Sequence, residues 1–147
     1  MSETDLIRLY SQRILALAAD IPHLGRLPAP QGTARRRSPL CGSTVTADVV
    51  LQDGKIVEFR QDVKACALGQ AAAAVAGAAM IGRTRTELEA ARDALAVMLK
   101  DGGPVPAAPF DGFEVLLPAR DYRNRHASIL LALEAAAEAA AAAEASA

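Results

Sequence analysis

The strongest structural signal in this sequence is a pair of strand patterns joined by Asp53-Gly54. β-Branched and other apolar residues alternate with polar ones over residues 44–52 and again over residues 55–63. Asp-Gly between two such runs favours a tight hairpin turn, because both residues tolerate positive φ. We therefore expect an antiparallel hairpin. Two strands alone are only marginally stable, so residues near 36–40 are candidates for a third, edge strand.

The two cysteines of the chain flank this hairpin: Cys41 precedes the first strand and Cys66 follows the second. A hairpin returns the chain to its starting end, so we expect the thiols to meet at one end of the sheet. Their sulfurs should lie close enough to share one metal, on the order of 4 Å apart. Cys66 also begins a predicted helix and follows Lys64. A helix N-terminus and a nearby cation both favour thiolate, so we expect Cys66 to be the more thiolate-like cysteine.

Helical patterns surround the hairpin and place the chain in the α+β class, with a small antiparallel sheet packed against about four helices. Amphipathic spacing predicts a first helix over residues 3–19. The run of small residues after Cys66 predicts a helix that other elements can approach closely. Thr84 and Glu87 form a capping-box pattern at the start of the next helix. A last helix is expected from about Tyr122 to Ala142.

Three segments are expected to lack stable regular structure. Residues 20–39 contain four prolines and the run Arg35-Arg36-Arg37, which we interpret as a loop that is either solvated or docks an acidic partner. Residues 101–119 also contain four prolines and should hold at most a short helical turn. The tail from about residue 135 is nearly all Ala and Glu. Because it lacks bulky side chains to pack, we expect it to fray.

Composition restricts the possible function classes. The 147 residues indicate a single domain, 1–147, that is large enough to bury a core without a disulfide or metal. A net charge of −1 and the absence of Trp argue against a nucleic-acid partner. No apolar run approaches the roughly 20 residues of a membrane span, and the acidic, polar start differs from a secretory signal. We therefore expect a cytoplasmic protein with no membrane partner, whose reduced thiols serve a metal or sulfur role.

Two cysteines are too few for a closed zinc site, which needs four ligands. The sequence offers further candidate ligands in His23, His126, Asp48 and Asp62. Two interpretations of His126 remain open: a histidine at a helix start among arginines, or a third ligand brought to the end of the hairpin. In the second interpretation the neighbouring arginines would favour anionic thiolates; they are Arg120, Arg123 and Arg125.

Over about residues 5–135 the chain resembles the iron–sulfur cluster assembly scaffolds of the NifU N-terminal, IscU and SufU-like family. The resemblance rests on the order and spacing of several motifs. They are Leu9-Tyr10 in the first helix, a Pro22–Gly25 turn, Pro39-Leu-Cys41-Gly42 before the hairpin, Cys66 at the start of a small-residue helix, and Arg125-His126-Ala-Ser at the last helix. The long stretch between Cys66 and His126 resembles the SufU-like branch, which carries an insertion there. The resemblance implies a single domain of this family.

The family's metal site uses three cysteines and an aspartate. The resemblance implies that Cys41 and Cys66 match the first two cysteines and that Ser43 stands at the aspartate position. His126 matches the third cysteine when Arg125 aligns with the arginine before it, which is the alignment we prefer. In the other alignment Ala127 occupies the cysteine position and the third ligand is lost.

The resemblance thus predicts Cys41, Cys66 and His126 as metal ligands, with Cys66 and Cys41 as sulfur acceptors. It implies partner docking at Arg120, Arg123 and Arg125.

The function implied by the resemblance is a scaffold for iron–sulfur cluster assembly rather than an enzyme. Such a protein would accept sulfur from a cysteine desulfurase, hold iron, zinc or a transient iron–sulfur cluster, and serve cluster-receiving proteins. One alternative is a zinc-bound persulfide acceptor, in which zinc holds the thiols until the desulfurase frees one. Another is a non-catalytic interaction module that kept the fold and lost the metal. A cysteine hydrolase using Cys66 and His126 lacks a recognisable orienting residue or oxyanion hole.

Overall fold

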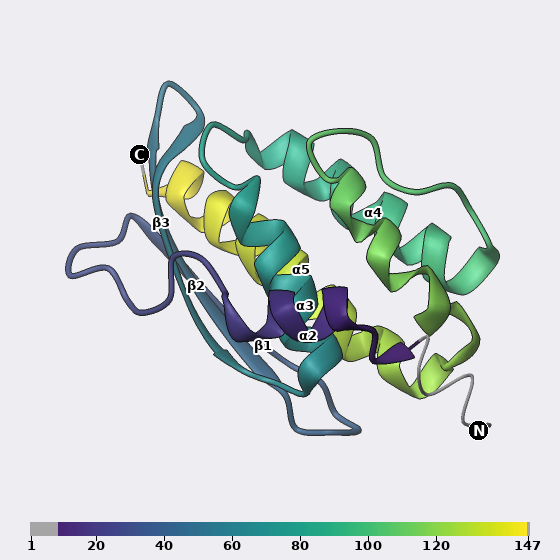
Figure 1. The fold of residues 1–147 in the computed structure, drawn as a ribbon. Helices are drawn as coiled ribbons and strands as arrows, with labels where there is room; N and C mark the ends of the chain where they lie inside the picture. Colours follow the sequence, from purple (N-terminus) through teal and green to yellow (C-terminus); the bar gives the residue numbers. More distant parts are fainter. Residues whose placement is uncertain (1–8, 147) are drawn as a thin grey trace.

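The structure, a computed structural model that describes residues 9–146, is a three-stranded antiparallel sheet covered on one face by helices (Figure 1). The strands β1 (Gly32–Arg37), β2 (Thr44–Gln52) and β3 (Lys55–Lys64) lie in the order β1-β2-β3. Asp53 and Gly54 join β2 to β3 with φ values of 54° and 78°, as a hairpin turn of this kind requires. The predicted α+β class and hairpin are confirmed.

The edge strand lies earlier in the chain than expected. β1 pairs with β2 from Gly32 opposite Val49 to Arg37 opposite Thr44. The run Arg35-Arg36-Arg37, expected in a loop, is therefore part of this strand, and its residues are exposed. Charged side chains suit an edge strand because they discourage pairing with a second chain. The segment lacks an apolar alternation, which is why the sequence pattern did not reveal it.

The helices occur on one side of the sheet. In chain order they are α2 (Gln12–Ala19), α3 (Ala67–Ala78), α4 (Arg85–Asp101), the 3₁₀ helix η1 (Asp111–Asp121) and α5 (Arg123–Ala145). α5 packs along β1 and β2, and α3 packs against both α2 and α5 (Figure 1). α4 packs on α5 farther from the sheet. α3 and α5 thus form the layer between the sheet and the outer elements.

Two helical boundaries differ from the predictions. The helix expected over residues 3–19 is interrupted at Tyr10, and α2 begins afresh because Ser11 caps it by accepting a hydrogen bond from the Ile14 N–H at 3.3 Å. Residues 3–8 of the expected helix lie outside the described part. The segment 101–119 holds more than one turn, since η1 is 11 residues long. Its buried residues Phe113, Leu116 and Ala119 recur every three positions, which is the period of a 3₁₀ helix.

The alanine-rich tail is packed rather than frayed. α5 continues to Ala145, and its buried side chains include Ala135, Ala136, Ala137, Ala139, Ala140 and Ala143. Gly32 of β1 lies against this part of α5, where a Cβ would come 2.6 Å from the backbone nitrogen of Ala143. Small side chains therefore bring the helix backbone against the strand. The absence of bulky residues, which we read as an inability to pack, is what permits this contact.

α5 is long and apolar enough, by length and composition alone, to cross a membrane, contrary to the expectation that no apolar run approaches the length of a membrane span. However, 72% of the relevant window is buried inside the fold. A core helix that is apolar on most sides passes the same test. We therefore describe α5 as the central helix of the core.

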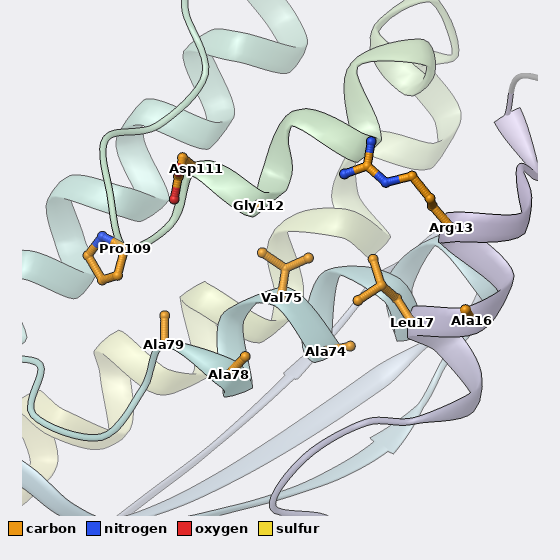
Figure 2. Close-up of a pocket in the computed structure, with 10 residues that line it drawn as sticks. All are labelled: Arg13, Ala16, Leu17, Ala74, Val75, Ala78, Ala79, Pro109, Asp111 and Gly112. Atoms are coloured by element: carbon orange, nitrogen blue, oxygen red, sulfur yellow. The ribbon is translucent and has the colours of Figure 1, made fainter.

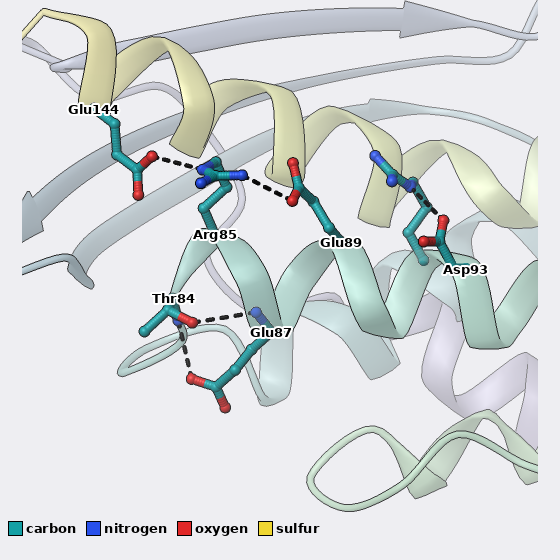
Figure 3. A network of polar contacts seen from close by, with 7 residues as sticks. Thr84, Arg85, Glu87, Glu89, Asp93 and Glu144 are labelled. Atoms are coloured by element: carbon teal, nitrogen blue, oxygen red, sulfur yellow. Dashed lines mark hydrogen bonds and ion pairs between the residues drawn. The ribbon is translucent and has the colours of Figure 1, made fainter.

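The capping box predicted at the start of α4 is confirmed. Thr84 Oγ1 accepts a hydrogen bond from the Glu87 N–H, and the Glu87 carboxylate accepts one from the Thr84 N–H, both at 3.1 Å (Figure 3). Arg85 then pairs with Glu89 on the same helix and with Glu144 of α5 (Figure 3). These contacts tie the first turn of α4 to the last turns of α5.

Candidate functional site

Both cysteines lie at the end of the sheet where β2 begins and β3 ends. Cys41 is exposed in the β1–β2 loop, and Cys66 is the partly buried N-cap residue of α3. The loop is closed by two backbone hydrogen bonds, from Ser38 N–H to the Ser43 carbonyl at 2.8 Å and from Gly42 N–H to the Ser38 carbonyl at 3.0 Å. Cys41 is thereby held on a tight turn beside the hairpin end.

Two serine hydroxyls connect the thiols. Ser43 Oγ is 3.0 Å from Cys41 Sγ, Ser128 Oγ donates to Ser43 Oγ across 3.3 Å, and Ser128 Oγ is 3.4 Å from Cys66 Sγ. We call Cys41–Ser43–Ser128–Cys66 the thiol–serine chain. Ser43 and Ser128 are only 5% and 2% exposed. Gly69 of α3 makes room for Ser128, because a Cβ there would lie 2.6 Å from the Ser128 hydroxyl.

Serine hydroxyls also lower the pKa of Cys41 to about 7. The hydroxyl of Ser38 has the largest effect, followed by the hydroxyl and backbone of Ser43, and together they outweigh the opposing effect of burial. Ser38 Oγ is buried and completes no hydrogen bond within residues 9–146, so its effect on Cys41 comes from the nearness of the hydroxyl dipole rather than from a well-aligned hydrogen bond. We expected the more thiolate-like cysteine to be Cys66. The structure instead places three hydroxyls around Cys41, a consequence of the tight loop that the sequence pattern did not reveal.

His126 has a different environment. Its ring is buried, and Nε2 lies 3.1 Å from the Ala119 carbonyl oxygen and 3.0 Å from that of Arg120. Nε2 therefore carries the proton and donates to both carbonyls, which joins α5 to the end of η1. The α5 side chain that contacts a thiol is Ser128, two residues later. Sequence reasoning missed Ser128, whose available signal was its place in the Arg-His-Ala-Ser motif.

The donor set at this site is two thiols and two neutral hydroxyls. Within the described residues no group of three or more His, Cys, Asp or Glu side chains could hold a metal ion. Thiolates are strong ligands for zinc and iron, whereas neutral hydroxyls are weak ones. The side chains gathered here do not fit a resident, closed zinc centre.

The three arginines predicted for partner docking have unequal environments. Arg120 Nε donates to the Met98 carbonyl and Nη2 to the Gly103 carbonyl, both at 2.8 Å. Its guanidinium thus binds the C-terminal end of α4, where carbonyls lack helical partners. Arg123 is exposed and Arg125 is partly buried. Arg123 also lines a surface hollow that includes His126.

The carboxylate Asp48, considered as a ligand, has a structural role. It is buried on β2 and accepts hydrogen bonds from Arg26 Nε at 2.6 Å, Thr33 Oγ1 at 2.6 Å and the Leu27 N–H at 3.0 Å. Burial raises the pKa of Asp48, but these donors outweigh it and hold the pKa below its usual value.

The remaining candidate ligands, His23 and Asp62, also lie in other settings. The His23 ring packs edge-on to Phe59, with centroids 5.9 Å apart. Asp62 lines a surface hollow together with Arg26 and Lys64.

A separate apolar hollow of about 580 Å³ lies between α2, α3 and the start of η1 (Figure 2). Leu17 and Val75 point into it, and Arg13 and Asp111 lie at its rim (Figure 2). None of the residues predicted for the metal or sulfur site lines this hollow. It is therefore distinct from the thiol–serine chain.

No protein-family profile and no curated protein matches the sequence, whereas solved structures do. The chain is similar to the crystal structure of the N-terminal part of a nitrogen-fixing NifU-like protein from Brucella abortus, with a TM-score of 0.93 and 43% identity over 97% of this chain and 99% of that chain. It is also similar to a protein described as an iron–sulfur cluster assembly scaffold for the SUF system of Fervidobacterium islandicum AW-1, with a TM-score of 0.79 and 20% identity over 91% of this chain and 98% of that chain. A hypothetical protein of known structure matches with a TM-score of 0.80 and 23% identity over 92% of this chain and 98% of that chain. The last two likenesses concern the fold alone.

Proposed function

Because this chain belongs to the family of NifU-like N-terminal domains, we propose that it is a scaffold in iron–sulfur cluster assembly. It accepts sulfur from a cysteine desulfurase at Cys41 and Cys66, carries iron, zinc or a transient cluster, and passes its cargo to recipient proteins. The observation that carries this proposal is the thiol–serine chain, which links both cysteines at one end of the sheet. The role belongs in the cytoplasm, where thiols stay reduced.

The metal is best treated as cargo. Two thiolates suit iron and zinc, and the weakness of hydroxyl ligands leaves positions open for sulfide or for ligands of a recipient protein. His126 remains our proposed third ligand. Its Nε2–H bonds to backbone carbonyls, which leaves the lone pair of Nδ1 for a metal, an arrangement typical of metal-bound histidines. The ring faces η1, on a side of α5 about 200° from the Ser128 side chain that meets Cys66, so metal binding requires α5 and η1 to shift until Nδ1 and the thiols surround the ion.

Partner docking is proposed at the start of α5. Arg123 is exposed near this end of the helix, and Arg125 is partly exposed. An acidic segment of a desulfurase would complement them electrostatically and would approach the exposed thiol of Cys41. Arg120 contributes indirectly, since its hydrogen bonds to the end of α4 hold η1 and α5 in place.

A zinc-bound persulfide acceptor is the second candidate. The observation that favours it is the presence of only two strong ligands among the four side chains of the thiol–serine chain. A protein with so few strong ligands is better suited to receiving one sulfur than to holding an entire cluster. In this version the protein transfers sulfur and a separate scaffold builds the cluster.

The test combines metal analysis with activity. Protein purified without chelator is analysed for zinc and iron, reconstituted anaerobically with iron and sulfide, and added to a cysteine desulfurase supplied with cysteine. We expect bound metal and stimulated desulfurase turnover, both lost in Cys41→Ala and Cys66→Ala. Cluster absorbance after reconstitution supports the scaffold, and stimulation without a cluster supports the persulfide acceptor. If the protein binds no metal and does not stimulate the desulfurase, the non-catalytic interaction module is the remaining interpretation.

A further inference from the structure

The two edges of the sheet differ in how their backbone groups are covered. Along β3, the outer edge bonds to a neighbouring loop: the Gln61 N–H donates to the His23 carbonyl, and the Gln61 carbonyl accepts from the Gly25 N–H, both at 2.9 Å. β1 forms the opposite edge, and its outer side has no backbone partner among residues 9–146. β1 therefore presents unpaired N–H and C=O groups to which a further strand can bond.

The register shows which residues of β1 point to this free edge. The Ser38 N–H donates to the Ser43 carbonyl at 2.8 Å, so these two residues form a hydrogen-bonded pair at the end of the β1–β2 ladder. Such pairs recur at every second residue of an antiparallel ladder. The backbone groups of Thr33, Arg35 and Arg37 therefore point away from β2.

The arginines of β1 lie on two different faces of the sheet. Arg36 points to the helical side and forms an ion pair with Glu138 of α5 at 3.2 Å. Because side chains alternate along a strand, Arg35 and Arg37 lie on the open face. Both are exposed, and neither forms an ion pair within the described part of the chain.

The neighbouring groups on the open face leave these two charges uncompensated. Arg26 and Asp48 form an ion pair with each other. The hollow that Arg35 lines also contains one further cation and one carboxylate, Lys64 and Asp62. The positive charges of β1 thus require an anion from outside the chain for compensation.

These charges select which strand can pair with β1. A second copy of this chain would bring the same arginines against the first set, and like charges on paired strands are destabilising. A strand with carboxylates at alternate positions forms pairs of opposite charge instead. We propose that the free edge of β1 binds an extended acidic segment of a partner protein, whose carboxylates face Arg35 and Arg37.

The bound segment holds its protein beside the loop that carries Cys41. Arg37 is the last residue of β1, and a Cβ on Gly42 would lie 3.7 Å from its guanidinium. The edge nevertheless shares no residue with the thiol–serine chain. The inference therefore does not depend on metal binding or on sulfur transfer.

The test uses the isotope-labelled full chain and a short synthetic peptide that alternates Glu and Thr. NMR titration at physiological ionic strength measures the affinity, and amide hydrogen exchange shows which backbone groups become bonded. At saturating peptide we expect exchange to slow about tenfold at Thr33, Arg35 and Arg37, the scale of one hydrogen bond. The amides of Ala34 and Arg36 already point to β2 and should change little. The same peptide with every amide N-methylated keeps its charges but cannot donate to the edge, so it should bind roughly tenfold more weakly.

Variants of the arginine run separate edge pairing from general attraction. Arg35→Gln and Arg37→Gln should each weaken peptide binding about threefold, the scale of one cross-strand pair of opposite charges. Arg36→Gln is the matched control, because it removes the same charge from the same strand but on the helical side, and it should leave the affinity nearly unchanged. The amide spectrum of each variant verifies its fold.

Three results would overturn the inference. They are equal weakening by all three variants, tight binding of the N-methylated peptide, and peptide binding without slowed exchange at the outward amides. A single-stranded oligonucleotide that binds as tightly as the peptide would show a general surface for polyanions and would also overturn it. Failure of metal binding or of desulfurase stimulation would refute the proposed function and leave the edge inference standing.

Discussion

Gly32 of β1 packs directly against the backbone of Ala139 in α5, with no space for a Cβ between them. The two residues lie at the edge strand and in the alanine-rich part of the last helix, far apart in the sequence. Their contact sets the separation between the sheet edge and the central helix. Arg36 of β1 adds to this contact an ion pair with Glu138 of α5 at 3.2 Å.

Gly32→Ala should therefore destabilise the fold. The added Cβ meets backbone atoms that cannot rotate away, and overpacking of this kind costs about 1–3 kcal/mol. Urea denaturation at neutral pH measures the change in the free energy of unfolding. Gly112→Ala is the matched control, because the nearest atom to its new Cβ is a Val75 side-chain methyl at 3.1 Å. An unchanged urea midpoint for Gly32→Ala would show that the tail of α5 is not packed as described.

Asp48→Asn should destabilise the protein at neutral pH by about 2 kcal/mol, the typical contribution of hydrogen bonds to a charged group. The folded state lowers the pKa of Asp48, so its stabilising contribution is present above the unfolded pKa of about 3.9 and is lost as the pH falls through the folded pKa. Urea denaturation at pH 7 and at progressively lower pH measures the free energy of unfolding of both proteins. The difference between wild type and Asp48→Asn should shrink in acid.

The exposed Asp93 supplies a control for that measurement. Its side chain is 71% exposed and pairs only with the neighbouring Arg92 among the described ion pairs. Exposed pairs contribute little, so Asp93→Asn should change stability by less than about 0.5 kcal/mol. An Asp48→Asn protein that matches Asp93→Asn at pH 7 would refute the buried hydrogen-bond network.

Alkylation of Cys41 in the metal-free protein should follow a midpoint near pH 7, because thiolate is the reactive form and the pKa of Cys41 is lowered to about 7. Removing the nearby Ser38 hydroxyl raises the pKa of Cys41, so Ser38→Ala should shift the midpoint upward and slow the reaction at pH 7. Iodoacetamide labelling across pH, with Cys41 followed by mass spectrometry, measures both. A wild-type midpoint near the unperturbed value of about 8.5 would contradict the role of the serine hydroxyls.

His126 can be tested without breaking its structural contacts. His126→Gln keeps a side-chain N–H for the Ala119 and Arg120 carbonyls but removes the imidazole. Because His126 is the proposed third ligand, His126→Gln should release most of the zinc or iron. His126→Cys should retain more metal than wild type, because thiolate binds more strongly than imidazole. Elemental analysis measures the metal bound to each variant, and competition with a zinc indicator measures the zinc affinity. Full metal affinity in His126→Gln would show that His126 joins η1 to α5 and does not bind metal.

Local chemistry in the sequence was sufficient to predict several elements. Asp53-Gly54 between alternating strands determined the hairpin, because few residue pairs accept two consecutive positive φ values. Thr84 and Glu87 determined the start of α4 through their reciprocal capping bonds. The position of Cys66 at the start of α3 followed from the run of small residues after it. In each case the cause lies within a few neighbouring residues.

Tertiary packing decided the rest. His126 and Ser128 are two positions apart on one helix, and at about 100° per residue their side chains point to faces about 200° apart. The rotation of α5 against β1 and η1 therefore decides that Ser128 meets Cys66 while His126 meets the carbonyls of η1. The same packing buries the alanines and turns the arginine run into an edge strand. These outcomes depend on contacts between distant segments, and no local pattern in the sequence contains them.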